Sequence, residues 1–225
     1  MPNNNEQIPF TLPVEDARAR EDLIESSANF TAIEMIDAWP DWPGNVAILA
    51  GPVGSGKSHL ASIWAQQAEA EIFNMEDLRS EHALSGDFKN YVLENADAGG
   101  IDETALFHLI NQTRANGNFL LITSRTWPQS WEVTLPDLSS RLRGAFLVEL
   151  LEPDDLLLGL VIHKLFADRQ LEVDPAVVNY LVVRMERSLG VAGKIVEKLD
   201  HEALARNTKI TKALAGKVLQ DMTSS

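Results

Sequence analysis

Eight residues between positions 51 and 58 carry the clearest chemical signal in the chain. They are Gly51, Pro52, Val53, Gly54, Ser55, Gly56, Lys57 and Ser58, and they match the pattern G-x-x-x-x-G-K-S/T in full. Glycines let successive backbone N–H groups converge on phosphate oxygens, lysine supplies charge to the terminal phosphates, and a hydroxyl can ligate Mg²⁺. The pattern therefore predicts a loop that binds the polyphosphate of a nucleotide.

The segments on either side of this loop supply the context that the pattern needs. Val46–Ala50 is a continuous apolar run, typical of a strand buried on both faces. From Lys57 to about Ala70, apolar residues recur at helical spacing. Because the positive end of that helix would point at the loop, the order strand, loop, helix favours an anion-binding site over a plain Gly-rich turn.

Strands and helices continue to alternate through the first two thirds of the chain. Further strands are predicted at Glu71–Asn74, Tyr91–Leu93, Phe119–Thr123 and Phe146–Leu150, and a helix at Ala105–Ala115. Strands separated by helices favour a parallel sheet with helices on both faces. We therefore expect an α/β fold with three αβα layers.

The pattern changes after Pro153, where no strand is predicted. Helices are expected at Asp154–Asp168, Ala176–Arg187, Gly190–Ala205 and Thr211–Met222. We expect a tail over residues 1–25, an α/β nucleotide-binding core over 26–152 and a small all-α lid domain over 153–225.

Composition and charge narrow the classes of function. The 225 residues are 45% hydrophobic and include no Cys, which excludes disulfides, cysteine-based zinc sites and thiol catalysis. No apolar run is long enough to span a bilayer, and the first residues show no signal-peptide pattern, so we expect a cytoplasmic protein. Residues 1–153 hold 9 Lys/Arg against 23 Asp/Glu, whereas residues 154–225 hold 10 of each. This acidic excess disfavours direct nucleic-acid binding.

Several motifs give the chain a resemblance to a known family. His59-Leu60 after the loop is similar to the DnaA branch of AAA+ ATPases, as is the segment from Glu21 to Phe30, which in that branch lies against the adenine. The resemblance runs to about residue 222 and leaves out the helix-turn-helix domain that DnaA carries. The chain therefore resembles Hda/HdaA-type regulatory inactivators of DnaA, which implies an AAA+ P-loop core, bound ATP or ADP, and Mg²⁺.

Two further motifs imply partners through the same resemblance. Leu135–Leu142 resembles an arginine-finger motif, which makes Arg141 the candidate finger acting in trans, with Arg143 as an alternative helper. The tail peptide resembles the sliding-clamp-binding peptide of Hda, and its contact residues would be Gln7, Ile8, Phe10 and Leu12. The implied partners are a DnaA-type initiator and the DNA polymerase sliding clamp, and self-association is left open.

Other positions depart from the family pattern. At the Walker B acid pair, Glu94 can hold a metal-bound water, which makes Ser58 and Glu94 the candidate Mg²⁺ residues, but the next residue is Asn95. A neutral amide is not a general base, so we expect weak intrinsic hydrolysis. Ser124 is the candidate for the sensor I group, because Arg125 stands where the family has an Asp. Lys194 is the nearest candidate for sensor II.

The favoured hypothesis is an adenine-nucleotide-binding regulator of replication initiation that stimulates ATP hydrolysis in a DnaA-type initiator. One alternative is an autonomous P-loop ATPase or kinase, which a steady-state ATPase assay of the isolated protein would reveal. The other is a helicase-loader-like AAA+ module, which lacks a clamp-binding tail. Clamp capture with Gln7→Ala and Phe10→Ala variants separates that module from the favoured hypothesis.

Overall fold

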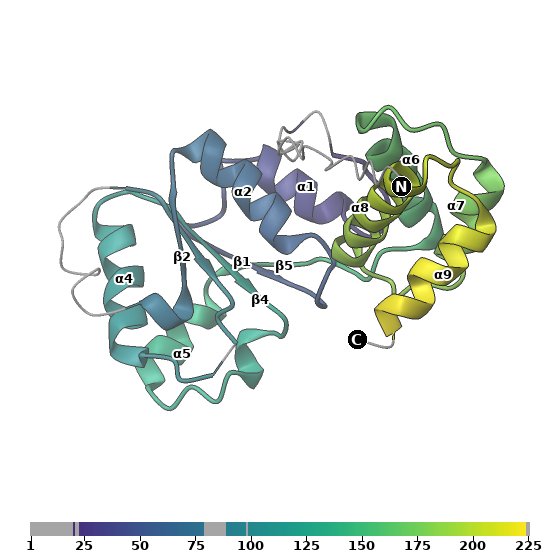
Figure 1. Ribbon diagram of the computed structural model, residues 1–225. Coiled ribbons are helices and arrows are strands. Elements are labelled where there is room, and N and C mark those ends of the chain that lie inside the picture. Colours follow the sequence, from purple (N-terminus) through teal and green to yellow (C-terminus); the bar gives the residue numbers. More distant parts are fainter. Residues whose placement is uncertain (1–19, 21–22, 79–88, 98, 224–225) are drawn as a thin grey trace, which may run out of the picture. The chain divides into compact units, whose positions relative to one another are not determined.

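The computed structural model describes residue 20 and residues 23–78, 89–97 and 99–223 (Figure 1). These residues fall into two compact units, an α/β unit that ends at Glu152 and a helical unit that starts at Pro153. The candidate clamp-contact residues of the tail lie outside the described residues.

The described strands of the α/β unit form one parallel sheet in the order β2-β3-β4-β1-β5. Their bounds are β1 Val46–Ala50, β2 Glu71–Asn74, β3 Tyr91–Glu94, β4 Leu120–Ser124 and β5 Phe146–Glu149. All five predicted strands are present to within one residue at each end. The inner strands β1, β3 and β4 are mostly apolar and buried, as expected for strands that helices cover on both faces, whereas the edge strand β2 is mostly exposed.

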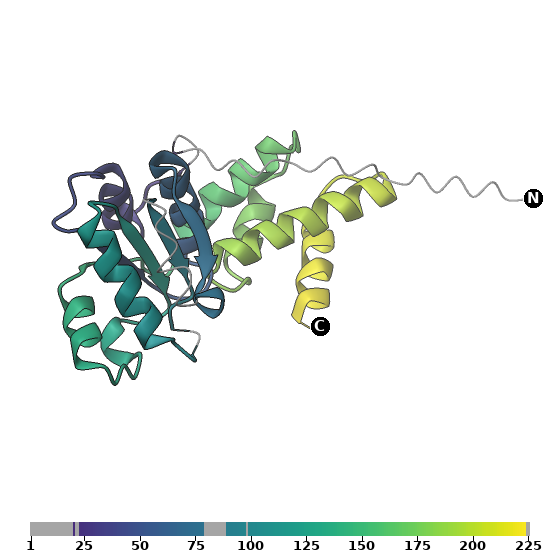
Figure 2. The same cartoon turned by 90° about the vertical axis from the view of Figure 1, so that its left-hand side faces the viewer.

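Alternation along the strands builds a core on each face of the sheet. Ala47 and Leu49 of β1 pack with α1 (Phe30–Asp37) and α2 (Lys57–Ala68). Val46 and Ile48 pack on the other side with α4 (Glu103–Ala115) and α5 (Pro136–Arg143) (Figure 1). Figure 2 views the unit from the α4 side. The three-layer prediction is confirmed.

Two helices of this unit were not predicted. In α1, the buried residues Ala32, Ile33, Met35 and Ile36 form an apolar stripe, but the helix has only 8 residues, which is short for a periodicity signal. In α5, only Leu138 and Leu142 are buried, one helical turn apart, and the rest of its sequence is polar. Two apolar positions are too few for a periodicity signal, so this segment resembled a loop.

The helical unit contains α6 Asp155–Asp168, α7 Pro175–Val182, α8 Leu189–Arg206 and α9 Lys212–Thr223 around its own core. Asp154 and Asp174 cap α6 and α7 through their side chains. The prediction for α7 was too long at its C-terminal end. The helix ends at Val182, and further along the chain Ser188 is extended, accepts the N–H of Val191 and caps α8.

Among the described residues, no helix combines the length and the apolar character that a membrane span requires.

Candidate functional site

The predicted phosphate loop connects the carboxyl end of β1 to the first turn of α2. Gly54 and Gly56 have φ of 75° and 106°, a left-handed conformation that costs glycine little. The structure shows no side-chain cap at the N-terminus of α2 among the described residues, and the N–H of Leu60 donates to the carbonyl of Gly56. The N–H groups of the first turn therefore have the donor capacity that an anion needs.

The backbone at Gly51 lies so close to the backbone at Leu150 that only glycine fits at position 51. A Cβ at this position would lie 2.2 Å from the carbonyl oxygen of Leu150. The approach follows from the extension of β5 along β1, where the N–H of Leu150 donates to the carbonyl of Ala50 at 2.7 Å. On the other side, the N–H of Gly51 donates to the carbonyl of Ser124 at 3.1 Å. The start of the loop is thus held between β4 and β5.

Lys57 is the first residue of α2, and its side chain folds back over the phosphate loop. Its ammonium group donates to the carbonyl oxygens of Gly51 and Pro52, at 2.8 Å each. Burial lowers the pKa of Lys57, and the carboxylates of Asp97 and Glu94 partly offset this, whereas the Arg125 guanidinium lowers it further. Four charged groups from three segments therefore interact at this edge of the sheet.

The ends of β3 and β4 meet the loop at the same edge, as parallel strands require. Glu94 is the last residue of β3 and is partly exposed. Asn95 follows in a left-handed conformation with φ of 59°. Its amide donates to Asn74 Oδ1 at 2.9 Å, and its backbone N–H donates to Thr123 Oγ1 at 3.3 Å. Asn95 is thereby fixed by two neighbouring strands.

Ser124 and Arg125 lie at the end of β4 and have different surroundings. Ser124 is 1% exposed, and its hydroxyl donates to the carbonyl of Thr126 at 2.6 Å. Arg125 is exposed and forms an ion pair with Asp97 at 2.9 Å. Ser124 is therefore held by a local bond in the interior, whereas Arg125 presents its charge at the surface.

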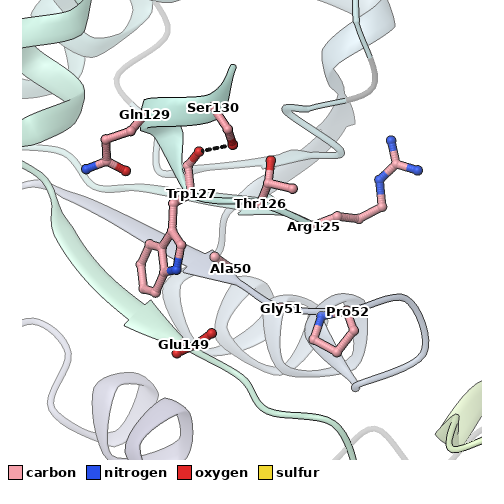
Figure 3. A pocket seen from close by; sticks show the side chains of 9 residues that line it. All are labelled: Ala50, Gly51, Pro52, Arg125, Thr126, Trp127, Gln129, Ser130 and Glu149. Carbon is pink, nitrogen blue, oxygen red and sulfur yellow. Dashed lines mark hydrogen bonds between the residues drawn. The ribbon is translucent and has the colours of Figure 1, made fainter. Parts of the chain in front are cut away.

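A hollow of about 630 Å³ opens beside the start of the loop (Figure 3). Its lining comes from the carboxyl ends of β1 and β5 and from the segment after β4: Ala50, Gly51, Pro52, Arg125, Thr126, Trp127, Gln129, Ser130 and Glu149. In Figure 3 the Trp127 ring and the Glu149 carboxylate lie on one side of the hollow and Arg125 extends away from them. The sequence analysis did not identify the lining residues Thr126, Trp127 and Glu149. They lie at or after the carboxyl ends of β4 and β5, where α/β sheets bind ligands.

Three further candidate residues, Arg141, Lys194 and His59, lie on helices. Arg141 is exposed in the last turn of α5, and the structure gives its guanidinium no hydrogen bond or ion pair with a described residue. Lys194 is exposed in the second turn of α8, in the helical unit. His59 lies in the first turn of α2 and is partly buried.

The candidate Mg²⁺ residues fit the chemistry of that ion. Ser58 is exposed in the first turn of α2, and Glu94 is close enough to the loop to raise the pKa of Lys57. A hydroxyl and a carboxylate are hard oxygen ligands, as Mg²⁺ prefers. Among the described residues, no group of three or more His, Cys, Asp or Glu forms a metal site, so Mg²⁺ would also need phosphate oxygens and water.

Comparison with known proteins identifies this architecture. No protein-family model matches the chain. An uncharacterized protein of Haemophilus influenzae is 25% identical over 186 residues, which cover 75% of this chain and 79% of that protein.

Solved structures match over most of the chain. Domain III of the replication initiation protein DnaA from Thermotoga maritima has a TM-score of 0.78 at 19% identity, covering 93% of this chain and 98% of that one. AMPPCP-bound DnaA from Aquifex aeolicus has a TM-score of 0.69 at 19% identity, covering 83% and 66%. A variant of RuvB from Thermotoga maritima has a TM-score of 0.73 at 15% identity, covering 92% and 73%. The chain therefore has the AAA+ P-loop fold of DnaA domain III and RuvB.

Proposed function

We propose that this chain binds ATP or ADP in the loop Gly51–Ser58 and regulates the initiation of DNA replication. The observation that carries nucleotide binding is the bend from β1 into α2, where two left-handed glycines and Lys57 surround one point. The similar DnaA structure from Aquifex aeolicus is bound to AMPPCP, an adenine nucleotide analogue, which supports an adenine nucleotide here too.

The loop would bind the polyphosphate through backbone N–H groups at the start of α2 and through Lys57. In the structure the ammonium group donates to two loop carbonyls, which hold it at the mouth of the loop. Phosphate oxygens are stronger acceptors for an ammonium than neutral carbonyls are, so Lys57 can exchange these bonds for bonds to phosphate. Ser58 and Glu94 would hold Mg²⁺, which bridges terminal phosphate oxygens and offsets their charge.

Hydrolysis by the chain alone should be slow. The residue after Glu94 is Asn95, whose amide cannot accept a proton from an attacking water. Its side chain also donates to Asn74, so it is already oriented by a structural contact. Such a site would retain its nucleotide more often than it hydrolyses it.

The regulatory step would use Arg141 on a nucleotide held by another protein. Arg141 is exposed on a helix that Leu138 and Leu142 anchor in the core. A free guanidinium on a rigid support can stabilise charge on a transferring γ-phosphoryl group across an interface. We propose that Arg141 acts in this way on ATP bound to a DnaA-type initiator, and that the peptide Gln7–Leu12 tethers the chain to the sliding clamp.

One experiment tests binding and regulation together. The purified wild-type chain, Lys57→Ala and Arg141→Ala are compared for nucleotide affinity and for stimulation of ATP hydrolysis by purified DnaA in the presence of clamp and DNA. We expect Lys57→Ala to weaken nucleotide binding by about 100-fold, because charge-assisted bonds to phosphate are lost. We expect Arg141→Ala to bind nucleotide normally and to lose stimulation by about 10³-fold or to background.

Matched variants control for the removal of charge. Lys89→Ala removes an exposed lysine that pairs with Glu71 before β3, at the opposite edge of the sheet, and should bind nucleotide like wild type. Arg206→Ala removes an exposed arginine of α8 and should stimulate fully. Full stimulation by Arg141→Ala would remove this residue from the mechanism, and unchanged binding by Lys57→Ala would refute the nucleotide site.

A further inference from the structure

The hollow beside the phosphate loop has one wall that hydrogen bonds hold in place. This wall is the segment that follows β4. The carbonyl of Thr126 accepts bonds from the Ser124 hydroxyl at 2.6 Å and from the indole N–H of Trp131 at 3.0 Å. The carbonyl of Trp127 accepts the N–H of Ser130 at 3.0 Å and its hydroxyl at 2.8 Å (Figure 3). The backbone that carries the Trp127 ring is therefore fixed on both sides of the ring.

Glu149 brings a carboxylate to the same side of the hollow as the Trp127 ring (Figure 3). In β5, Val148 packs in the core with α1 and α2, and Leu147 packs in the core with α4 and α5. Because side chains alternate along a strand, Glu149 faces the same side of the sheet as Leu147. Ala50 also lines the hollow, and its side chain is only a methyl group, which leaves room above the strand ends.

The charge of Glu149 is not neutralised within the hollow. Glu149 is exposed, and the structure gives its carboxylate no hydrogen bond or ion pair with a described residue. Arg125 lines the hollow too, but its Nε donates to Asp97 at 2.9 Å and its side chain extends away from the Trp127 ring (Figure 3). The charge that faces a ligand beside the ring is therefore negative.

An indole ring next to an unpaired carboxylate attracts a cation. The face of an indole is the best aromatic surface for a cation, and a carboxylate forms short charge-assisted bonds with N–H donors. A guanidinium can stack flat on the ring while its N–H groups donate in its own plane, whereas an ammonium is a compact and more strongly hydrated charge. Gln129 and Ser130 also line the hollow, and their oxygens can accept further N–H groups.

We infer that this hollow binds the guanidinium of an arginine side chain presented by a partner protein, against the Trp127 ring and the Glu149 carboxylate. The excess of 23 Asp/Glu over 9 Lys/Arg in residues 1–153 would attract such a partner over a longer range. The inference goes beyond the proposed function, because the site needs no nucleotide. Gly51 and Pro52 line the hollow as well, so the docked side chain would lie against the start of the phosphate loop.

The test titrates the full-length chain with N-acetylargininamide at constant ionic strength and follows the indole N–H signals of its five tryptophans by NMR. The signal that is missing from Trp127→Phe is that of Trp127. We expect this signal to shift saturably with the probe and to stay in place with N-acetylcitrullinamide, which has a similar shape without the charge. In Glu149→Gln the half-saturating concentration should rise about tenfold, because a charge-assisted bond is lost.

Glu34→Gln is the matched control for the removal of a carboxylate. Glu34 is exposed on α1, which covers the other face of the sheet, so this variant should bind the probe like wild type. An equal rise of the half-saturating concentration in both variants would show that overall charge alone attracts the probe, and would overturn the inference. An unshifted Trp127 signal, or comparable shifts of all five indole signals, would overturn it as well. Thermal melting confirms that each variant is folded.

Two further probes check the chemistry of the ligand. N-acetyllysinamide should bind severalfold more weakly than the arginine probe, because an ammonium cannot stack and donate in a plane at once. Equal affinity for the two would overturn the choice of arginine. Methyl β-glucoside tests for an uncharged, hydrogen-bonding ligand, since hydroxyl and amide groups also line the hollow. A saturable Trp127 shift with the glucoside and none with the arginine probe would replace the guanidinium by a hydroxylated ligand.

Discussion

The phosphate loop and the adjoining ends of β3 and β4 lie on one edge of the sheet but are stabilised in different ways. In the loop, backbone conformation and bonds between residues close in sequence dominate, such as those from Lys57 to Gly51 and Pro52. At the strand ends, side chains bond over long sequence separations, as Asn95 does with Asn74 and Arg125 with Asp97. A locally determined loop can be recognised from a short pattern, whereas the neighbouring chemistry depends on which strands the fold places side by side.

The largest effect should come from adding one carbon to the loop. In Gly51→Ala the new Cβ would meet the backbone oxygen of Leu150 at 2.2 Å, and backbone atoms cannot move away cheaply. We expect a loss of about 2–3 kcal/mol in the free energy of unfolding, measured by urea denaturation, and weaker nucleotide binding. Gly44→Ala is the matched control, since nothing lies within 4 Å of its added Cβ. Equal unfolding midpoints for both variants would show that the backbone approach does not constrain the loop.

The second change tests whether the absence of a carboxylate at position 95 limits ATP hydrolysis. Asn95→Asp would place a carboxylate after Glu94, and Asp tolerates the left-handed conformation that Asn95 adopts. We expect hydrolysis to rise about tenfold in a single-turnover phosphate-release assay, because a carboxylate can act as a general base and an amide cannot. Asn207→Asp, at another left-handed position, is the control. An unchanged rate would place the limit on turnover elsewhere.

The third change separates the two neighbours at the end of β4. Ser124→Ala removes a buried hydroxyl that bonds to the carbonyl of Thr126, so we expect a loss of about 1 kcal/mol in the free energy of unfolding. Urea denaturation measures this loss, and calorimetry with AMPPCP measures its effect on binding. A loss of AMPPCP affinity of about tenfold or more would assign Ser124 a direct contact with the nucleotide.

The smallest effect concerns the start of α5, the helix that carries Arg141. Hydrogen bonds from the backbone N–H groups of Thr134 and Leu135 lower the pKa of Glu103, and the Thr134 hydroxyl adds a third bond. Because the folded-state pKa lies below the unfolded value, this stabilisation is fully present above the unfolded pKa, about 4.3. It is lost as the pH falls through the folded-state pKa.

Thermal melting between pH 7 and pH 3 tests this expectation. Glu103→Gln should have a slightly lower Tm than wild type at pH 7 and a smaller loss of Tm on acidification. Glu34→Gln, at an exposed position of α1, is the control and should follow the wild-type curve. Parallel wild-type and Glu103→Gln curves would show that Glu103 does not stabilise the start of α5 through its charge.

Much of the fold was predictable because its signals are local. Five strands, the loop after β1 and the four described helices of the C-terminal unit are each visible within windows of four to eighteen residues. The elements that were missed, α1 and α5, have weak local signals. The start of α5 is stabilised by Glu103, which lies more than thirty residues earlier in the chain and leaves no pattern near Pro136.

The candidate site also has a part that local sequence predicts and a part that depends on distant residues. Glycines, a lysine and a hydroxyl at set spacing specify a phosphate loop from the chain alone, because glycine backbone freedom and helix geometry act over a few bonds. The partnership of Asp97 with Arg125 and the local bond of Ser124 became visible only in the folded chain. Strand order brings β4 between β1 and β3, and residues 28 positions apart then share one buried carboxylate.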